Sequence, residues 1–322
     1  MHLEHPGIVF EPGSRVTGAV TLRADAPVVL AVPLFLEWHA HGKGNEASEA
    51  LVRETLFDGS LDAGEERTLP FELEVPAAAA PYAGSVFQVD LRLRALAAIA
   101  TDPAHRHAEV TAPLQVAPPP PPRRFRVKPV SEVVPANAMK SLIQLLALAF
   151  LGVLLVVLSV VAPSIGFIGP CAGSVVAVGL VLAAIVFKRA MAERKVGSVT
   201  VAIEQEGSTS YRDDPGSAPL SVVVTTGARH ATAQVRLRVQ EVSTRGYGND
   251  STSYHETLFD ETVELADDAG ELRGRLRMPT PGEVPLPFQR GRHRVEWDVF
   301  VTIDAPGAPE WLQHHELEVT GE

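Results

Sequence analysis

The sequence predicts a mainly β protein in which two antiparallel β-sandwiches are joined by an α-helical transmembrane hairpin. Three observations predict it. Apolar and polar residues alternate with a period of two in both halves, four short motifs recur in the same order in each half, and two long uncharged runs lie between the halves. The predicted boundaries are a sandwich over 1–117, a Pro-rich basic linker over 118–140, a two-helix hairpin over 141–187, a basic linker over 188–195 and a second sandwich over 196–322.

The first sandwich is predicted from three alternating stretches. Their apolar members are Val16, Val20 and Leu22, then Leu34, Leu36 and Trp38, then Val89, Leu91 and Leu93. A period of two places one face of a strand in the core and the other face in water. Pro and Gly turns separate these stretches, which is typical of a β-sandwich built from short antiparallel strands.

The linker before the apolar region is rich in proline and arginine. Pro118–Pro122 followed by Arg123 fits a stiff polyproline spacer, and the same pattern also resembles an SH3 ligand. The basic run from Arg123 to Lys128 is expected to contact anionic lipid headgroups and to help set the topology.

The two uncharged runs predict the hairpin. Ser141–Val161 holds 21 residues and Ile165–Phe187 holds 23, and each is long enough to cross a hydrocarbon core of about 30 Å as a helix. Two buried helices of a soluble core are the alternative, but both runs are apolar all round rather than on one face. The lipid bilayer is therefore an expected partner.

The flanks of the hairpin predict its orientation. Lys and Arg lie on both sides and none lies in the turn, so both sandwiches are expected on the cytoplasmic face of the inner membrane. No cleaved signal peptide is expected at the N-terminus. The single Cys171 fits a reducing compartment, and 23 Arg against 5 Lys suggests a GC-rich bacterial genome. Gly169, Gly173 and Ala177 are expected to pack within the hairpin, and dimerisation through them is left open.

The second sandwich is predicted from its own alternation and from an internal repeat. Val235, Leu237 and Val239 alternate with polar residues, as do Val295, Trp297, Val299 and Val301. Four motifs of the first half recur at offsets of 203, 204, 202 and 206 residues: Pro12-Gly13-Ser14, Gly42-x-Gly44-Asn45, Glu54-Thr-Leu-Phe-Asp58 and Asp62-Ala-Gly-Glu65. This order predicts one domain used twice.

The first half resembles the arrestin-like domain family. The resemblance is carried by Phe10-Glu-Pro-Gly13, by the alternation from Val16 to Leu22, by Pro70-Phe-Glu-Leu-Glu-Val-Pro76, and by the Val89–Leu93 strand. It implies two immunoglobulin-like or arrestin-like sandwiches that bind membrane-associated partners. The long apolar insertion and the lack of a PPxY motif depart from the family pattern, so the ubiquitin-adaptor role of one branch is not carried over.

Glu37-x-His39-x-His41 is the strongest candidate for a metal site. Alternate residues of a strand point the same way, so two imidazoles and a carboxylate could converge, with His105 and His107 as further ligands. A solvated sheet edge without a cavity is the alternative, and we favour it. His314 and His315 cannot share a strand face and are expected at the surface.

The carboxylate-rich segments Asp58–Glu66 and Asp260–Glu271 lack the ligand spacing of a calcium loop. They are expected to be solvated hairpin turns. In the repeated Glu-Thr-Leu-Phe-Asp motif, we expect Leu and Phe in the core and Asp58 and Asp260 as turn formers.

Charge and motifs limit the function classes. Residues 1–117, 118–195 and 196–322 carry 8, 9 and 11 Lys and Arg against 16, 2 and 21 Asp and Glu, for net charges of −8, +7 and −10. Neither acidic half offers the basic face that phosphates need, so nucleic acid is not expected as a partner. No nucleophile-elbow, phosphate-loop or zinc-protease motif occurs in a fitting context.

The sequence therefore predicts a membrane-tethered, non-catalytic scaffold or adaptor for a protein partner at the cytoplasmic face. No catalytic, cofactor-binding or metal-binding residue is predicted, and no cofactor. An accessory subunit of a membrane complex, docked through the hairpin, is the alternative. A metal-dependent enzyme seated at Glu37, His39 and His41 is a third hypothesis. Homo-oligomerisation is left open.

Overall fold

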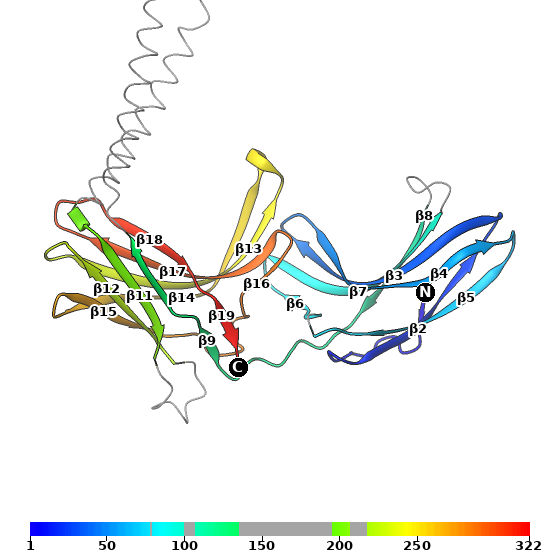
Figure 1. Cartoon of the computed structure of the whole chain (residues 1–322), viewed down its shortest axis with the longest axis horizontal. Coiled ribbons are helices and arrows are strands. Elements are labelled where there is room, and N and C mark those ends of the chain that lie inside the picture. Colours follow the sequence, from blue (N-terminus) through cyan, green and yellow to red (C-terminus); the bar gives the residue numbers. More distant parts are fainter. Residues whose placement is uncertain (78, 100–106, 135–194, 207–217) are drawn as a thin grey trace, which may run out of the picture. The chain divides into compact units, whose positions relative to one another are not determined.

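The computed structural model describes residues 1–77, 79–99, 107–134, 195–206 and 218–322 (Figure 1). These residues form two compact units. Unit 1 comprises Met1–Pro122, Gln240–Leu258 and Pro285–Glu296, and unit 2 comprises Arg123–Val239, Phe259–Val284 and Trp297–Glu322. The predicted domain boundaries at 117 and 196 stay a prediction.

Unit 1 contains two antiparallel sheets (Figure 1). The smaller sheet has the strand order β1 (His2–Leu3), β2 (Arg15–Arg23) and β5 (Glu66–Glu74). The larger has the order β4 (Ala47–Leu61), β3 (Val28–Gly42), β7 (Phe87–Ile99) and β6 (Tyr82–Ala83), with β8 (His107–Leu114) also paired to β7.

The core of unit 1 lies between these two sheets. Its buried cluster combines side chains from both: Val16, Val20, Phe71 and Leu73 from the smaller sheet, and Leu34, Leu36, Leu91 and Leu93 from the larger. Because the strands alternate, Phe35, Glu37 and His39 lie on the other face of β3. The predicted alternation at Val16–Leu22, Leu34–Trp38 and Val89–Leu93 is confirmed by β2, β3 and β7.

Glu241 and His293 are two of the polar residues buried in unit 1. Glu241 is 1% exposed, and its carboxylate accepts hydrogen bonds from the Tyr82 hydroxyl and from the Val86 backbone N–H at 2.8 Å. His293 is fully buried, with Nδ1 2.9 Å from the Ser243 hydroxyl and Nε2 2.7 Å from the Asn45 carbonyl oxygen. These contacts attach segments 240–258 and 285–296 to residues 1–122 within this unit.

Unit 2 is built mainly on a continuous antiparallel sheet. Its strands are β10 (Val130–Val134), β11 (Val199–Gln205), β12 (Leu220–Thr226), β15 (Glu271–Leu276), β14 (Thr252–Asp268), β13 (Thr232–Arg245), β17 (His293–Asp304) and β16 (Phe288–Arg290), in that order, with β18 (Trp311–Glu316) paired to β17. β16 and one end of each of β13, β14 and β17 belong to unit 1. A separate pair joins β9 (Phe125–Val127) to β19 (Val319–Gly321).

The core of unit 2 is formed by strand faces that alternate strictly. Its fully buried members include Val199, Val201, Ile203, Leu220, Val222, Val224, Val235, Leu237, Val239, Trp297, Val299, Val301 and Ile303. Trp297 also packs edge-on against Phe125, with ring centroids 5.0 Å apart. The alternation predicted for β13 and β17 is confirmed. It leaves Arg236 and Arg238 of β13 on the outer face, where a binding site can form.

The repeated Glu-Thr-Leu-Phe-Asp motif lies within strands rather than at turns. Asp58 is in the interior of β4 and Asp260 is in the interior of β14, so the prediction that both are turn formers was wrong. The turns follow later, at Gly64 and Gly270, where φ is positive. A short motif fixes neither strand length nor strand pairing, which explains the error.

The predicted fold class and localisation need a correction in their helical part. Nineteen strands make up the described structure, and its one complete helix is a 3-10 turn at Gly248–Asp250. Three residues at about 2.0 Å each are far too short for a hydrocarbon core of about 30 Å. Within the described ranges, no helix is long and apolar enough to cross a membrane. The hairpin at 141–187, with Cys171 and Gly169, Gly173 and Ala177, lies outside the described residues.

The range predicted as a linker contributes strands to unit 2. Phe125–Val127 forms β9 and Val130–Val134 forms β10, because Phe125 and Val127 bury their side chains. The basic run there is paired with acidic residues near the C-terminus: Arg126 lies 2.8 Å from Glu322, and Lys128 lies 2.8 Å from Glu318. The predicted lipid contact therefore competes with intramolecular ion pairs.

Candidate functional site

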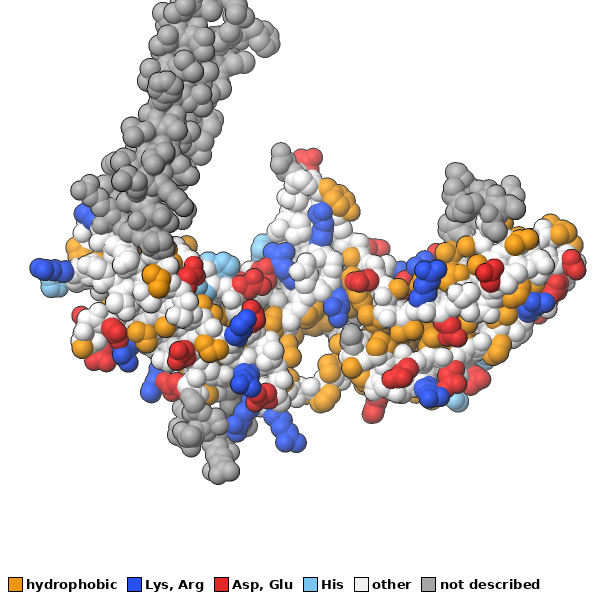
Figure 2. All heavy atoms as spheres, in the orientation of Figure 1, with side chains coloured by type: hydrophobic (Ala, Val, Ile, Leu, Met, Phe, Trp, Pro, Cys, Tyr) orange, Lys and Arg blue, Asp and Glu red, His pale blue; other side chains and the backbone are white. Residues whose placement is uncertain are grey.

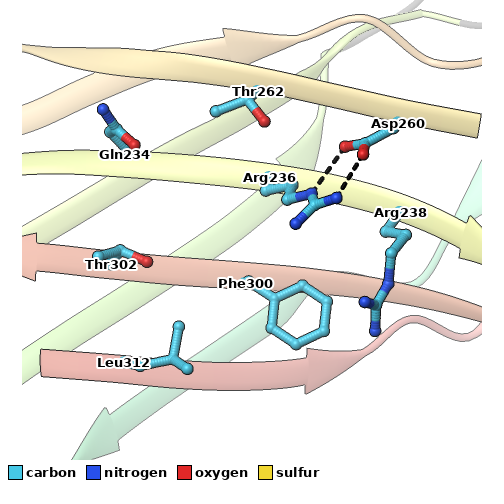
Figure 3. Close-up of a pocket in the computed structure, with 8 residues that line it drawn as sticks. All are labelled: Gln234, Arg236, Arg238, Asp260, Thr262, Phe300, Thr302 and Leu312. Carbon is cyan, nitrogen blue, oxygen red and sulfur yellow. Dashed lines mark hydrogen bonds and ion pairs between the residues drawn. The ribbon is translucent and has the colours of Figure 1, made fainter.

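A hollow of about 720 Å³ lies on the outer face of the sheet in unit 2 (Figure 3). Four adjacent strands supply its lining: Asp260 and Thr262 from β14, Gln234, Arg236 and Arg238 from β13, Phe300 and Thr302 from β17, and Leu312 from β18. All eight residues belong to unit 2. The hollow is thus a property of one sheet face.

The alternation of the strands places these side chains together. On β13 the core receives Val235, Leu237 and Val239, so Arg236 and Arg238 must point to the opposite face. The same rule turns Phe300 and Thr302 of β17 outward. On β18, Leu312 lies directly across from Thr302 and is 61% exposed.

One arginine of the hollow is fully engaged. The Arg236 guanidinium donates two hydrogen bonds to Asp260, one of them 2.7 Å from Nε to Oδ1 (Figure 3). This bond holds the pKa of Asp260 below its usual value and raises that of Arg236. A planar guanidinium matches both oxygens of a carboxylate, which favours this two-point contact.

The second arginine is differently placed. The Arg238 guanidinium lies over the ring of Phe300, 4.6 Å from its centroid, at the distance of a cation–π contact. Its nearest carboxylate is the buried Asp298, 3.8 Å away, and Asp298 already accepts a hydrogen bond from His314 at 2.7 Å. Arg238 Nε is buried and has no hydrogen-bond partner among the described residues.

The predicted Glu37, His39 and His41 do share one face of β3, but the site differs from both interpretations. β3 lies between β4 and β7, so it is a central strand and not a solvated edge. Glu37 is 2% exposed and receives hydrogen bonds from Arg92 at 2.6 Å and Arg94 at 2.9 Å. The Glu37 carboxylate is therefore already paired with two guanidinium groups, one on each oxygen.

The two histidines of that motif face other acidic residues. His41 Nε2 lies 2.7 Å from Asp90, and His39 Nε2 lies 3.5 Å from Glu46. Across the part of the chain that the structure describes, no group of three or more His, Cys, Asp or Glu is arranged to hold a metal ion. His105 lies outside the described residues, and His107 begins β8.

His314 and His315 occupy opposite faces of β18, as expected from their spacing. Only His314 is at the surface; His315 is buried, with Nδ1 3.2 Å from Glu132 of β10. Burial lowers the pKa of His315, and the adjacent Glu132 opposes that change. The expectation of two surface histidines was wrong for His315, because β10 lies within reach of this end of β18.

The residues of the hollow were not singled out from the sequence. Arg236-x-Arg238 and Asp298-x-Phe300 were assigned only to the polar faces of their strands. A signal was present: two arginines on one strand face, and an acid with an aromatic on another, are chemically complementary. A period of two does not show which strands are neighbours, so the sequence alone could not show that these two strand faces lie side by side.

Comparison with known proteins identifies no family for the chain. No protein-family model and no curated protein matches the chain. The crystal structure of Spo0M, the sporulation control protein of Bacillus subtilis, matches with a TM-score of 0.30 and 12% identity, over 79% of this chain and 87% of that one. At this TM-score and identity the match carries no argument about the fold of this chain. It carries no conclusion about activity.

Proposed function

We propose that the chain is a non-catalytic adaptor that binds a protein partner, and that the hollow in unit 2 is its docking site. One observation carries this proposal. On one face of a sheet the hollow presents Arg238, which has no hydrogen-bond partner among the residues that the structure describes, together with an aromatic ring and the 61% exposed Leu312. Aromatic and arginine side chains are the residues that most often dominate protein interfaces.

The extent of the hollow favours a protein segment over a small molecule. Its lining crosses four strands, which spans about 14 Å at about 4.8 Å per strand spacing. Small-molecule sites are usually clefts that enclose most of their ligand. A sheet face of this width is better covered by part of another protein.

The chemistry of the lining argues against catalysis. A general base works best with a pKa near the working pH. Asp260 is the only carboxylate among the eight described lining residues, and Arg236 holds its pKa below the usual value. Asp260 is therefore a weak proton acceptor. The remaining side chains are suited to positioning and contact.

Outside this hollow, both signs of charge are interspersed on the described surface. Figure 2 shows Lys and Arg beside Asp and Glu on the face turned to the viewer. Such a surface supports specific pairing with a protein more readily than attraction to a uniformly charged polymer. The arrestin-like resemblance, with its expected role in partner recruitment, is in line with this proposal.

Site-specific photo-crosslinking tests the proposal. The full chain carries a photo-reactive phenylalanine analogue in place of Leu312, and adducts formed in cells of its source are identified by mass spectrometry. The matched control carries the analogue in place of Val29 in unit 1, which is 49% exposed and outside the hollow. We expect a discrete protein adduct at Leu312 that is absent at Val29.

The captured protein is then purified and titrated into the unmodified chain. Saturable binding that is lost in Leu312→Asp supports docking at the hollow. Adducts of equal yield at both positions, or a captured protein that binds Leu312→Asp as well as the parent, would contradict the proposal.

A further inference from the structure

The two copies of the domain share one arrangement of charged and aromatic side chains, with the roles of two strands exchanged. In unit 1, β3 supplies Phe35 and β7 supplies Arg94, whose guanidinium lies 4.7 Å from the ring centroid. In unit 2, β13 supplies Arg238 and β17 supplies Phe300, at 4.6 Å. At the repeat offsets of 203 and 206 residues, Phe35 corresponds to Arg238 and Arg94 to Phe300. Both units therefore contain an arginine–phenylalanine contact, but the strand that supplies the arginine in one unit corresponds to the strand that supplies the phenylalanine in the other.

In unit 1 the arginine of this contact is paired with carboxylates of the same unit. Arg94 donates a hydrogen bond to the buried Glu37 at 2.9 Å, and its guanidinium also lies 3.8 Å from Glu109. Arg92 occupies the other oxygen of Glu37 at 2.6 Å. The guanidinium groups of Arg92 and Arg94 are therefore both hydrogen-bonded to Glu37.

In unit 2, Arg238 is not hydrogen-bonded to a carboxylate of the described residues. The position that matches Glu37 at the offset of 203 is Gln240, which is uncharged. Arg238 makes no hydrogen bond to any residue that the structure describes; its contacts are the Phe300 ring and the ion pair with Asp298 at 3.8 Å. Figure 3 shows its guanidinium beside Phe300 at the end of the hollow, apart from the Arg236–Asp260 pair.

We infer that the segment bound in the hollow carries a carboxylate, held by Arg238 against Phe300, and an apolar side chain, packed on Leu312. This inference rests on the proposed function and names the chemistry of the partner. The acids nearby give Arg238 no hydrogen bond. Asp260 is bonded to Arg236, Asp298 Oδ1 is bonded to His314, and Asp298 Oδ2 lies 3.8 Å from Arg238, beyond hydrogen-bond distance. Because the Arg238 side chain is partly exposed, an incoming carboxylate can reach its guanidinium and give it a charge-assisted hydrogen bond.

The sheet geometry sets the spacing of the two side chains. Arg238 adjoins Phe300, and Leu312 is paired with Thr302 two residues further along β17. Two strand spacings of about 4.8 Å and two residues of about 3.4 Å give a separation of about 12 Å between their backbone positions. An extended peptide covers this distance in three to four residues.

Fluorescence anisotropy with the full-length protein tests the inference. The probe is a fluorescein-labelled Gly/Ser decapeptide in which Leu precedes Glu by four positions. Companion probes replace Glu by Gln or Leu by Ser. We expect the parent protein to bind the first probe at least about tenfold more tightly than either companion, because the Gln probe loses a charge-assisted hydrogen bond and the Ser probe loses the apolar contact with Leu312.

Three variants locate the effect. Arg238→Gln is expected to lose about tenfold in affinity for the Glu probe and to bind the Gln probe as before. Arg238→Lys, which keeps the charge but not the planar fork, should fall between the two. The matched control, Arg94→Gln in unit 1, should bind like the parent. Thermal melting of each variant verifies that it is folded.

Several results would overturn the inference. One is equal affinity for the Glu and Gln probes. Another is an equal loss of affinity in Arg94→Gln and Arg238→Gln. The third is full displacement of the probe by decanoate, which would assign the site to a free acyl carboxylate. Failure here is distinguishable from failure of the adaptor function. A partner captured at Leu312 that binds Arg238→Gln unchanged would leave the adaptor intact and remove only its acidic ligand.

Discussion

Glu241 is the most constrained charged residue in unit 1. The segment from Tyr82 to Val86 surrounds its carboxylate, and a Cβ at Gly84 would overlap it. We expect Glu241→Ala to lower the free energy of unfolding by about 2–4 kcal/mol, because it leaves buried donors of Tyr82 and Val86 unpaired. Urea denaturation measures this. Glu256→Ala, at an exposed position in the same unit, is the control and should change stability little; equal effects of the two substitutions would contradict the assignment.

His293 should make stability depend on pH. Burial lowers its pKa from the usual value, although the bond to the Asn45 carbonyl opposes this. The unfolded chain binds the proton below about pH 6.5, where the folded chain resists it, so stability is complete above that pH and is lost as the pH falls further.

The melting temperature should therefore drop between pH 7.5 and pH 5.5. Because His315 shifts in the same direction, His293→Gln should reduce this drop and not abolish it. A melting temperature that stays constant or rises on acidification would exclude the buried neutral form of His293.

Strand position in the sheet should govern how rapidly backbone amides exchange. β12 is paired on both sides, by β11 and β15, and buries Leu220, Val222 and Val224. β10 is an edge strand in which Val133 is 64% exposed. We expect the amides of β12 to exchange at least about 100-fold more slowly than those of β10, as measured by hydrogen exchange with mass spectrometry. Equal rates would contradict the described strand order.

The strands themselves were the most predictable level of the structure. Alternation alone located the core faces of β2, β3, β7, β13 and β17, since burial of every second residue is a local property. The neighbours of each strand were not predictable, because pairing depends on residues far apart in sequence. For this reason Glu37 was assigned to a solvated edge although β7 covers it with Arg92 and Arg94, and the partnership of Arg238 with Phe300 was missed.

At the scale of the whole molecule, unit 1 draws on distant parts of the chain. Segments 240–258 and 285–296 supply Glu241, His293 and Phe288, which pack against Tyr82, Phe87 and Asn45. A fragment of residues 1–122 should therefore expose apolar rings that the full chain buries.

We expect this fragment to melt at least about 5 °C below the full chain and to bind the dye ANS, as structures with loosened packing do. Adding Glu241→Ala to the full chain should move its melting temperature in the same direction. A fragment as stable as the full chain would show that the distant segments contribute nothing to the packing of unit 1.

The two units each present a sheet face with an arginine beside an aromatic ring, but the chemistry around the arginine differs. In unit 1 Arg92 and Arg94 are bonded to Glu37, whereas in unit 2 Arg238 Nε has no hydrogen-bond partner among the described residues. On this account, changes at the face of unit 1 should affect stability, and changes at the face of unit 2 should affect binding.

Calorimetric titration of the partner captured at Leu312 tests the docking function most directly. The parent protein should bind it saturably, Leu312→Asp should lose at least about tenfold in affinity through the buried charge and lost apolar contact, and both proteins should melt at the same temperature. Identical binding by the parent and by Leu312→Asp would contradict the proposal that the hollow of unit 2 is the docking site.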